Sequence, residues 1–315
     1  MKYLYVRPVF LWLSAVAVMF LGACTSEVPS TSETAEAISF GVPQTRAAVE
    51  TANDMDAFSV WGWYTDTETG GNPVSVFNKT RVAQASGWNY EGGTRYWIPG
   101  KTYSFYGVYP HGLENVEVTS DGITITDFDC SATGENAVDL MTAVPNPISY
   151  NEGQTPESVK LAFGHQLVRV NFIVTSEGDA VNITNAKVYG MSYIGSLTAA
   201  GTWTLQEVST SDNTPFKTEE LSIPIGDTNT YYLFGGDMLL PPLTSLEGVV
   251  LEFDYQYTEG ESRHSKILLN NQSVATQWEA GKRYNYNINI PLNAVSVEFT
   301  VEVKDWDNKY YTVTW

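Results

Sequence analysis

The chain contains little of what catalytic, metal-binding or nucleic-acid-binding sites require. Its 315 residues include 2 Cys and 3 His, and no pair of these has the spacing of a zinc site. Lys and Arg number 17 against 36 Asp and Glu, so the formal net charge is -19. Because nucleic-acid binding needs cationic side chains that neutralise phosphates, this balance argues against a nucleic-acid partner.

Motifs of catalysis are missing as well. The sequence has no Ser nucleophile elbow, no phosphate-binding Gly-rich loop and no dinucleotide fingerprint. Acidic residues are so numerous that no single pair of carboxylates can be assigned to glycoside hydrolysis. The stretch Asp305-Trp306-Asp307-Asn308 lacks the Gly and the distant Glu of a calcium loop. We therefore expect no enzyme, no cofactor and no metal.

The few Cys and His residues have unremarkable surroundings. Cys130 follows Asp127 and Asp129 and has no basic neighbour that would lower its pKa. We expect it to be a small buried apolar residue. His165 stands at the start of an expected strand, where we expect a packed and hydrogen-bonded side chain.

What is present begins with an N-terminal export signal. Lys2 and Arg7 precede an apolar body at residues 9–20, which is shorter than the roughly 20 apolar residues of a membrane span. This layout predicts a secretory signal peptide over residues 1–23. The following Leu21-Gly22-Ala23-Cys24 resembles the bacterial lipobox. The resemblance implies that Cys24 carries lipid and holds the protein at a membrane surface.

The next stretch is polar and then becomes strand-like. Residues 25–36 are rich in Ser, Thr, Glu and Pro, which predicts a disordered tether. Ile38, Phe40 and Val42 alternate with polar or small residues, which predicts a strand with one apolar face. A polar stretch containing the Arg46–Ala47 bond follows, and a protease could reach that bond.

The remaining chain predicts an all-β fold. The whole sequence contains 19 Tyr and 9 Trp. In the remaining chain no long stretch has helical apolar spacing, and short apolar runs alternate with Gly and Pro turns. The strands expected include 58–64, 103–109, 168–174, 283–290 and 295–303, and a hairpin is expected at 88–98. This spacing is typical of β-sandwiches. A polar segment at 149–158 predicts a boundary between domains at 47–158 and 159–315.

Several motifs, taken in order, resemble those of the fimbrillin family of Bacteroides-type bacteria. They are Tyr96-Trp97-Ile98-Pro99-Gly100-Lys101, Asp139-Leu140-Met141, Leu161-Ala162-Phe163-Gly164-His165-Gln166, Trp278-Glu279-Ala280-Gly281-Lys282 and Val303-Lys304-Asp305-Trp306. The lipobox and Thr45-Arg46-Ala47 match as well.

The resemblance implies two β-sandwich domains of transthyretin-like type and export as an outer-membrane lipoprotein. It also implies cleavage after Arg46 by a trypsin-like protease and polymerisation with other fimbrial subunits by donor-strand exchange. Such an exchange needs a removable strand, for which Ile38, Phe40 and Val42 are candidates. It also needs a donor, and Tyr311, Val313 and Trp315 alternate at the C-terminus within the possible donor strand 310–315.

An alternative function is that of a surface lipoprotein that binds glycans through exposed aromatic side chains. The candidates for stacking on sugars are Trp61, Trp63, Trp88 and Trp97. The opposing interpretation is that these rings are buried, because aromatic residues in strands usually pack in cores or interfaces.

Overall fold

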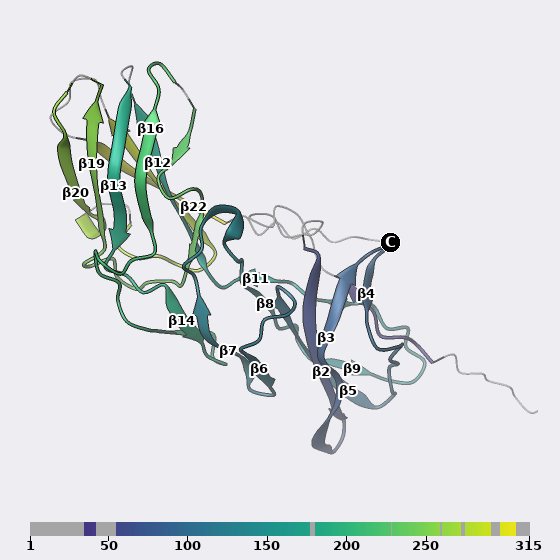
Figure 1. Cartoon of the computed structure of the whole chain (residues 1–315). Coiled ribbons are helices and arrows are strands. Elements are labelled where there is room, and N and C mark those ends of the chain that lie inside the picture. Colours follow the sequence, from purple (N-terminus) through teal and green to yellow (C-terminus); the bar gives the residue numbers. More distant parts are fainter. Residues whose placement is uncertain are drawn as a thin grey trace, which may run out of the picture. The chain divides into compact units, whose positions relative to one another are not determined.

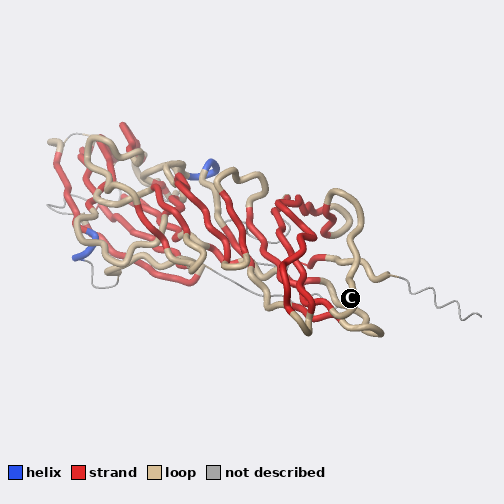
Figure 2. The backbone as a smooth tube through the Cα atoms, turned by 90° about the horizontal axis from the view of Figure 1, so that it is seen from below, coloured by secondary structure: helices blue, strands red, loops and turns tan. Residues whose placement is uncertain are grey.

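The computed structural model describes residues 35–41, 55–176, 180–227, 229–258, 260–271, 275–290 and 297–306. Figure 2 shows that this part of the chain is almost entirely strand and loop. The helices among the described residues are two single 3-10 turns, η1 (Gly134–Asn136) and η2 (Leu269–Asn271). The expected all-β fold is therefore confirmed.

The first sheet is built mainly from the first half of the chain (Figure 1). Its seven strands are β2 (Ala57–Asp66), β3 (Gly70–Gln84), β4 (Trp88–Tyr90), β5 (Lys101–Tyr109), β8 (Met141–Ala143), β9 (Ile148–Tyr150) and β11 (Gly164–His165). In β5, Tyr103 and Phe105 are buried, whereas Thr102 and Ser104 are half-buried. This alternation places the aromatic rings on the core face of the sheet, because neighbouring side chains of a strand point to opposite faces.

A second layer, consisting of a short strand pair and loops, covers that core face. Strand β1 (Phe40–Gly41) pairs in parallel with β10 (Val159–Lys160). Ile38, Phe40, Val159 and Leu161 belong to the same buried cluster as Tyr103 and other side chains of the first sheet. Residues that precede β2 in the chain therefore complete the core of the first half.

The predicted hairpin at 88–98 is wrong in its second arm. β4 pairs with β3, and the strand expected at 94–98 is absent among these described residues. Instead, Tyr96 forms an isolated antiparallel bridge with Ala37. The local Gly-rich turn suggested a hairpin, but the true partner of this arm lies about sixty residues earlier in the chain, where local turn chemistry gives no signal.

The second sheet joins segments from both sides of residue 158. It contains β6 (Val116–Thr119), β7 (Gly122–Asp129), β14 (Ile194–Leu197) and β15 (Trp203–Leu205), in the order β15-β14-β7-β6. β10 and β11, which also lie beyond residue 158, pair with β1 and β8 of the first half. Strand pairing therefore crosses the position at which the polar segment suggested a boundary.

The third and fourth sheets form a sandwich. The third contains β12 (Val168–Ser176), β17 (Tyr231–Tyr232), β18 (Met238–Leu240), β21 (Lys282–Ile290) and β22 (Glu298–Asp305). The fourth contains β13 (Val181–Tyr189), β16 (Lys217–Ile223), β19 (Val250–Tyr257) and β20 (Arg263–Leu268). Side chains from both sheets lie in one buried cluster, in which Phe172 of β12 stacks on Tyr286 of β21 at 5.0 Å.

The sequence pattern explains why β21 lies inside this sandwich. Tyr284, Tyr286, Ile288 and Ile290 are buried and alternate with half-buried Asn residues. Burial of one such large side chain stabilises the fold by roughly 1.5–3 kcal/mol. A slip of one residue in register would expose all of these side chains, so the pattern specifies which face of β21 points inward.

Candidate functional site

The described residues nearest the N-terminus lie between two stretches that are distant in sequence. We call residues 36–41 the inserted segment. On one side, the Ile38 N–H donates to the Arg95 carbonyl at 2.8 Å, and the Trp97 N–H donates to the Glu36 carbonyl at 2.9 Å. On the other side, the amides of Val159 and Leu161 donate to the carbonyls of Ser39 and Gly41. The inserted segment thus makes main-chain hydrogen bonds along both edges.

Two side chains of the inserted segment are buried in the core. Ile38 is 2% exposed and Phe40 is 5% exposed. The Phe40 ring makes edge contacts with Phe77, Phe105 and Tyr90, at centroid distances of 5.2, 5.7 and 5.8 Å. Aromatic pairs in this geometry contribute about 0.5–1.5 kcal/mol each beyond their burial. Phe40 is therefore the main apolar anchor of the segment.

Arg95 and Tyr90 hold the wall beside the inserted segment in place. The Arg95 guanidinium donates to the carbonyls of Val76, Glu91 and Gly93 and lies 4.6 Å from the centre of the Phe77 ring. The Tyr90 hydroxyl donates to the Ile38 carbonyl at 3.0 Å. These contacts fix the backbone that receives the inserted segment. Sequence reasoning missed this wall, because nothing local links Tyr90 or Arg95 to Ile38.

The structure places only part of the predicted exchange site. Ile38 and Phe40 lie together with their apolar partners, as the alternation predicted. Cys24, Val42, Arg46, Ala47, Tyr311, Val313 and Trp315 lie outside the described residues.

The side chain just before the C-terminal segment is buried. Trp306 is 1% exposed and stacks on His165, with ring centroids 3.9 Å apart. His165 also contacts the Asp139 carboxylate through Nδ1 at 2.9 Å. His165 is thus packed and hydrogen-bonded as predicted, and Asp305 of the Asp305-Trp306-Asp307-Asn308 stretch is the last residue of β22.

Cys130 and two of the Trp residues are enclosed. Cys130 is buried, and burial raises the pKa of its thiol well above the ordinary value. This agrees with a packing role, because a reactive Cys needs an accessible thiolate. Trp61 and Trp97 are 5% and 4% exposed, so these two rings are buried, as the opposing interpretation held, and the alternative of glycan stacking fails for them. Both rings lie in cores, whereas Trp63 and Trp88 are half-buried.

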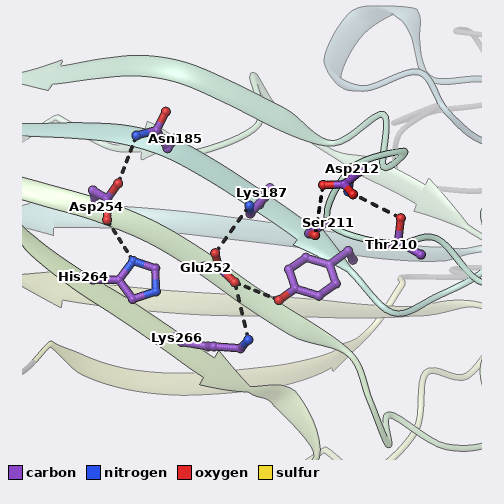
Figure 3. Close-up of polar contacts among 10 residues, drawn as sticks. Asn185, Lys187, Thr210, Ser211, Asp212, Glu252, Asp254, His264 and Lys266 are labelled. Atoms are coloured by element: carbon purple, nitrogen blue, oxygen red, sulfur yellow. Dashed lines mark hydrogen bonds and ion pairs between the residues drawn. The ribbon is translucent and has the colours of Figure 1, made fainter.

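The outer face of the fourth sheet carries a network of ion pairs (Figure 3). Glu252 lies between Lys187 and Lys266, at 3.4 and 3.7 Å, and accepts a hydrogen bond from Tyr189. Burial alone would raise the pKa of Glu252, but the Tyr189 hydroxyl and the Lys187 ammonium outweigh it and the net pKa is lowered. A carboxylate held ionised by such partners is typical of a stabilising surface network and unsuited to donating a proton.

Replacing Asn185 by glycine is expected to raise the pKa of Asp254. Hydrogen bonds from Asn185 and then His264 hold this pKa below its ordinary value. The folded carboxylate therefore adds stability above about pH 4, the ordinary range of Asp, and loses it as pH falls through the lowered folded pKa. Glycine suits the site because Asn185 has a φ of 54°. A carboxyl-carbon NMR titration measures the shift, and an unchanged pKa would contradict this assignment.

The described ranges contain neither a group of metal ligands nor a membrane-spanning helix. Among the described residues, no three His, Cys, Asp or Glu side chains are grouped so that they could hold a metal ion. In the same ranges, no helix is long and apolar enough to cross a membrane.

Solved structures of bacterial surface proteins share this fold. A fimbrial protein of Bacteroides vulgatus is 16% identical, with a TM-score of 0.58, and the alignment covers 86% of this chain and 99% of that one. Candidate cell adhesion proteins of Bacteroides uniformis and Bacteroides ovatus are 20% and 15% identical, with TM-scores of 0.52 and 0.54. Each of these two alignments covers 87% of this chain and nearly all of the other, 99% and 98%.

Sequence comparison identifies the family. No curated protein matches the sequence. The model of the fimbrillin-like family matches residues 45–306, which include both halves of the fold described above. The chain therefore belongs to the fimbrillin-like family.

Proposed function

We propose that this protein is a structural or adhesive subunit of a surface fimbria that polymerises with other fimbrial subunits by strand exchange. Membership of the fimbrillin-like family supports the fimbrial role. In this proposal the chain is exported as an outer-membrane lipoprotein through residues 1–23 and Cys24. A trypsin-like protease then cuts the Arg46–Ala47 bond, and the lipidated piece 24–46 leaves with its strand. Residues 47–315 remain as the subunit.

The main support for this proposal is that the inserted segment is hydrogen-bonded along both edges and buries Ile38 and Phe40. Its loss would uncover Phe77, Tyr90 and Phe105 and leave main-chain groups at Arg95 and Val159 without their partners. An uncovered apolar surface beside an unpaired strand edge is unfavourable in water. A strand from a neighbouring subunit that restores both the hydrogen bonds and the apolar side chains would be bound by β-augmentation.

In this proposal Tyr311, Val313 and Trp315, which alternate with other residues in the sequence, supply such side chains from the donor segment 310–315. Each subunit would then receive a strand at one site and donate one from another. This contact is head-to-tail and does not close on itself, so it builds a filament.

Limited trypsin digestion is expected to produce a new N-terminus at Ala47 and to start polymerisation. The Arg46–Ala47 bond lies in a polar stretch, where proteolytic nicking concentrates. The products are run on a gel without boiling, and a ladder of bands with N-terminal sequence from Ala47 is the expected result. The matched control is Arg46→Ala, which should stay monomeric under the same digestion.

Two outcomes would count against this maturation. Assembled fibres that retain Cys24 would show that the lipidated piece does not leave. A ladder formed equally well by Arg46→Ala would place the activating cut elsewhere.

A further inference from the structure

A pocket opens on the face of the first sheet opposite to the inserted segment. Its volume is about 390 Å³, within the roughly 300–1,000 Å³ of typical ligand sites. Side chains from β2 and β5 form its floor, and the end of β6 with Ser120 forms a wall. We call it the Trp63 pocket.

Strand register explains which side chains form the floor. Trp63 lies directly opposite Ser104, and Thr65 lies opposite Thr102. These residues alternate with Tyr103 and its neighbours, which point into the core, so their side chains share the other face. The floor is therefore one aromatic ring beside three hydroxyl groups, on rigid paired strands.

A second aromatic ring stands at an angle to the first. The rings of Trp63 and Tyr106 are 5.5 Å apart between centroids and inclined by 71°. The Tyr106 hydroxyl donates to the Ser120 carbonyl at 3.2 Å and so ties the wall to the floor. Burial raises the pKa of Tyr106, which keeps this hydroxyl neutral.

The pocket is uncharged in an otherwise strongly acidic chain. Among the described residues that line it, none is Asp, Glu, Lys, Arg or His, whereas the whole chain has a net charge of -19. An anionic ligand would find no cation here and would be repelled by the surrounding field. The Thr102 hydroxyl already hydrogen-bonds to Thr67 and Ser149. A purely apolar ligand would therefore leave the Thr65 and Ser104 hydroxyls of the floor without partners, which is unfavourable.

We propose that the Trp63 pocket binds a neutral saccharide. One face of a sugar ring, rich in C–H groups, would stack on Trp63, as apolar groups do on aromatic rings. The sugar hydroxyls would exchange hydrogen bonds with Thr65 and Ser104, while Thr102 stays bonded to Thr67 and Ser149. This inference does not depend on strand exchange, because the pocket lies on the opposite face of the sheet from Phe40.

The test uses the purified, undigested protein on an array of neutral and sialylated oligosaccharides, followed by calorimetry with the strongest neutral binder. Trp63→Ala is expected to weaken binding by at least about 10-fold, because it removes the stacking surface. Trp63→Phe and Ser104→Ala, which disturb the fold less, should each weaken it by a few-fold. Tyr96→Ala is the matched control, because Tyr96 is 49% exposed and does not line this pocket. The affinity of this variant for the saccharide should equal that of the wild type.

Three outcomes would overturn the proposal. They are binding to none of the neutral oligosaccharides, a preference for sialylated ones, or equal binding by the wild type, Trp63→Ala and Trp63→Phe. The trypsin ladder of each variant is measured in parallel. A variant that loses the ladder but binds sugar normally bears on strand exchange alone, and one that loses sugar binding but keeps the ladder bears on this pocket alone.

Discussion

Replacing Phe40 by alanine is expected to release the inserted segment while the rest of the fold stays intact. The substitution removes the edge contacts with Phe77, Tyr90 and Phe105 and leaves a cavity in a buried cluster. Such a change costs about 3–5 kcal/mol, so the detached population of the segment should rise by at least about 100-fold. Hydrogen exchange of the Ile38 amide, which donates to Arg95, measures this population directly.

Exchange elsewhere in the fold distinguishes release from general unfolding. Amides in the β12–β21 pair should exchange as in the wild type, because they belong to a separate cluster. Trypsin should also cut after Arg46 faster than in the wild type. The matched control is Phe128→Ala, which removes a buried ring of the other cluster and should leave exchange of the Ile38 amide as in the wild type. If Phe40→Ala accelerated all of these amides equally, the segment would be an integral strand and could not be removed.

Deletion of residues 310–315 is expected to abolish polymerisation and leave folded monomers. In the proposal these residues carry the donor strand, whereas β22 and the Trp306–His165 contact lie before them and stay in place. The thermal midpoint should therefore change by no more than a few degrees, as expected for less than about 1 kcal/mol. After trypsin digestion the truncated protein should give no ladder. Mixed with wild-type subunits, it should shorten their ladder, because it accepts a strand but donates none.

A charge placed on either face of the same strand tests the alternation. Val313→Asp would put a carboxylate among apolar side chains, where burial of an unpaired charge is strongly unfavourable, and should prevent the ladder. Thr312→Asp adds the same charge on the opposite face and should be tolerated. A truncated chain that still polymerises, or an equal effect of the two Asp variants, would place the donor strand elsewhere.

Regular alternation made much of the fold predictable from local sequence. The pattern in 283–290 predicted the strand β21, and the pattern in 103–109 predicted β5. Ile38 and Phe40 were likewise predicted to share an apolar face, and both are buried. These predictions succeed because the side chains of a strand point alternately to its two faces. A strand with one buried face therefore has apolar residues at every second position of the sequence.

What the sequence by itself determined is the all-β class, the inward faces of the strands and the motifs of the family. Only the tertiary structure decided that residues 36–41 lie between Arg95 and Val159, that strand pairing crosses residue 158, and that Trp63 lines a pocket whereas Trp61 and Trp97 do not. The physical reason is that main-chain hydrogen bonds between strands are the same whatever the side chains are, so they do not specify which strands pair. Partners distant in the chain are selected by the packing of the whole core, and no local pattern records that selection.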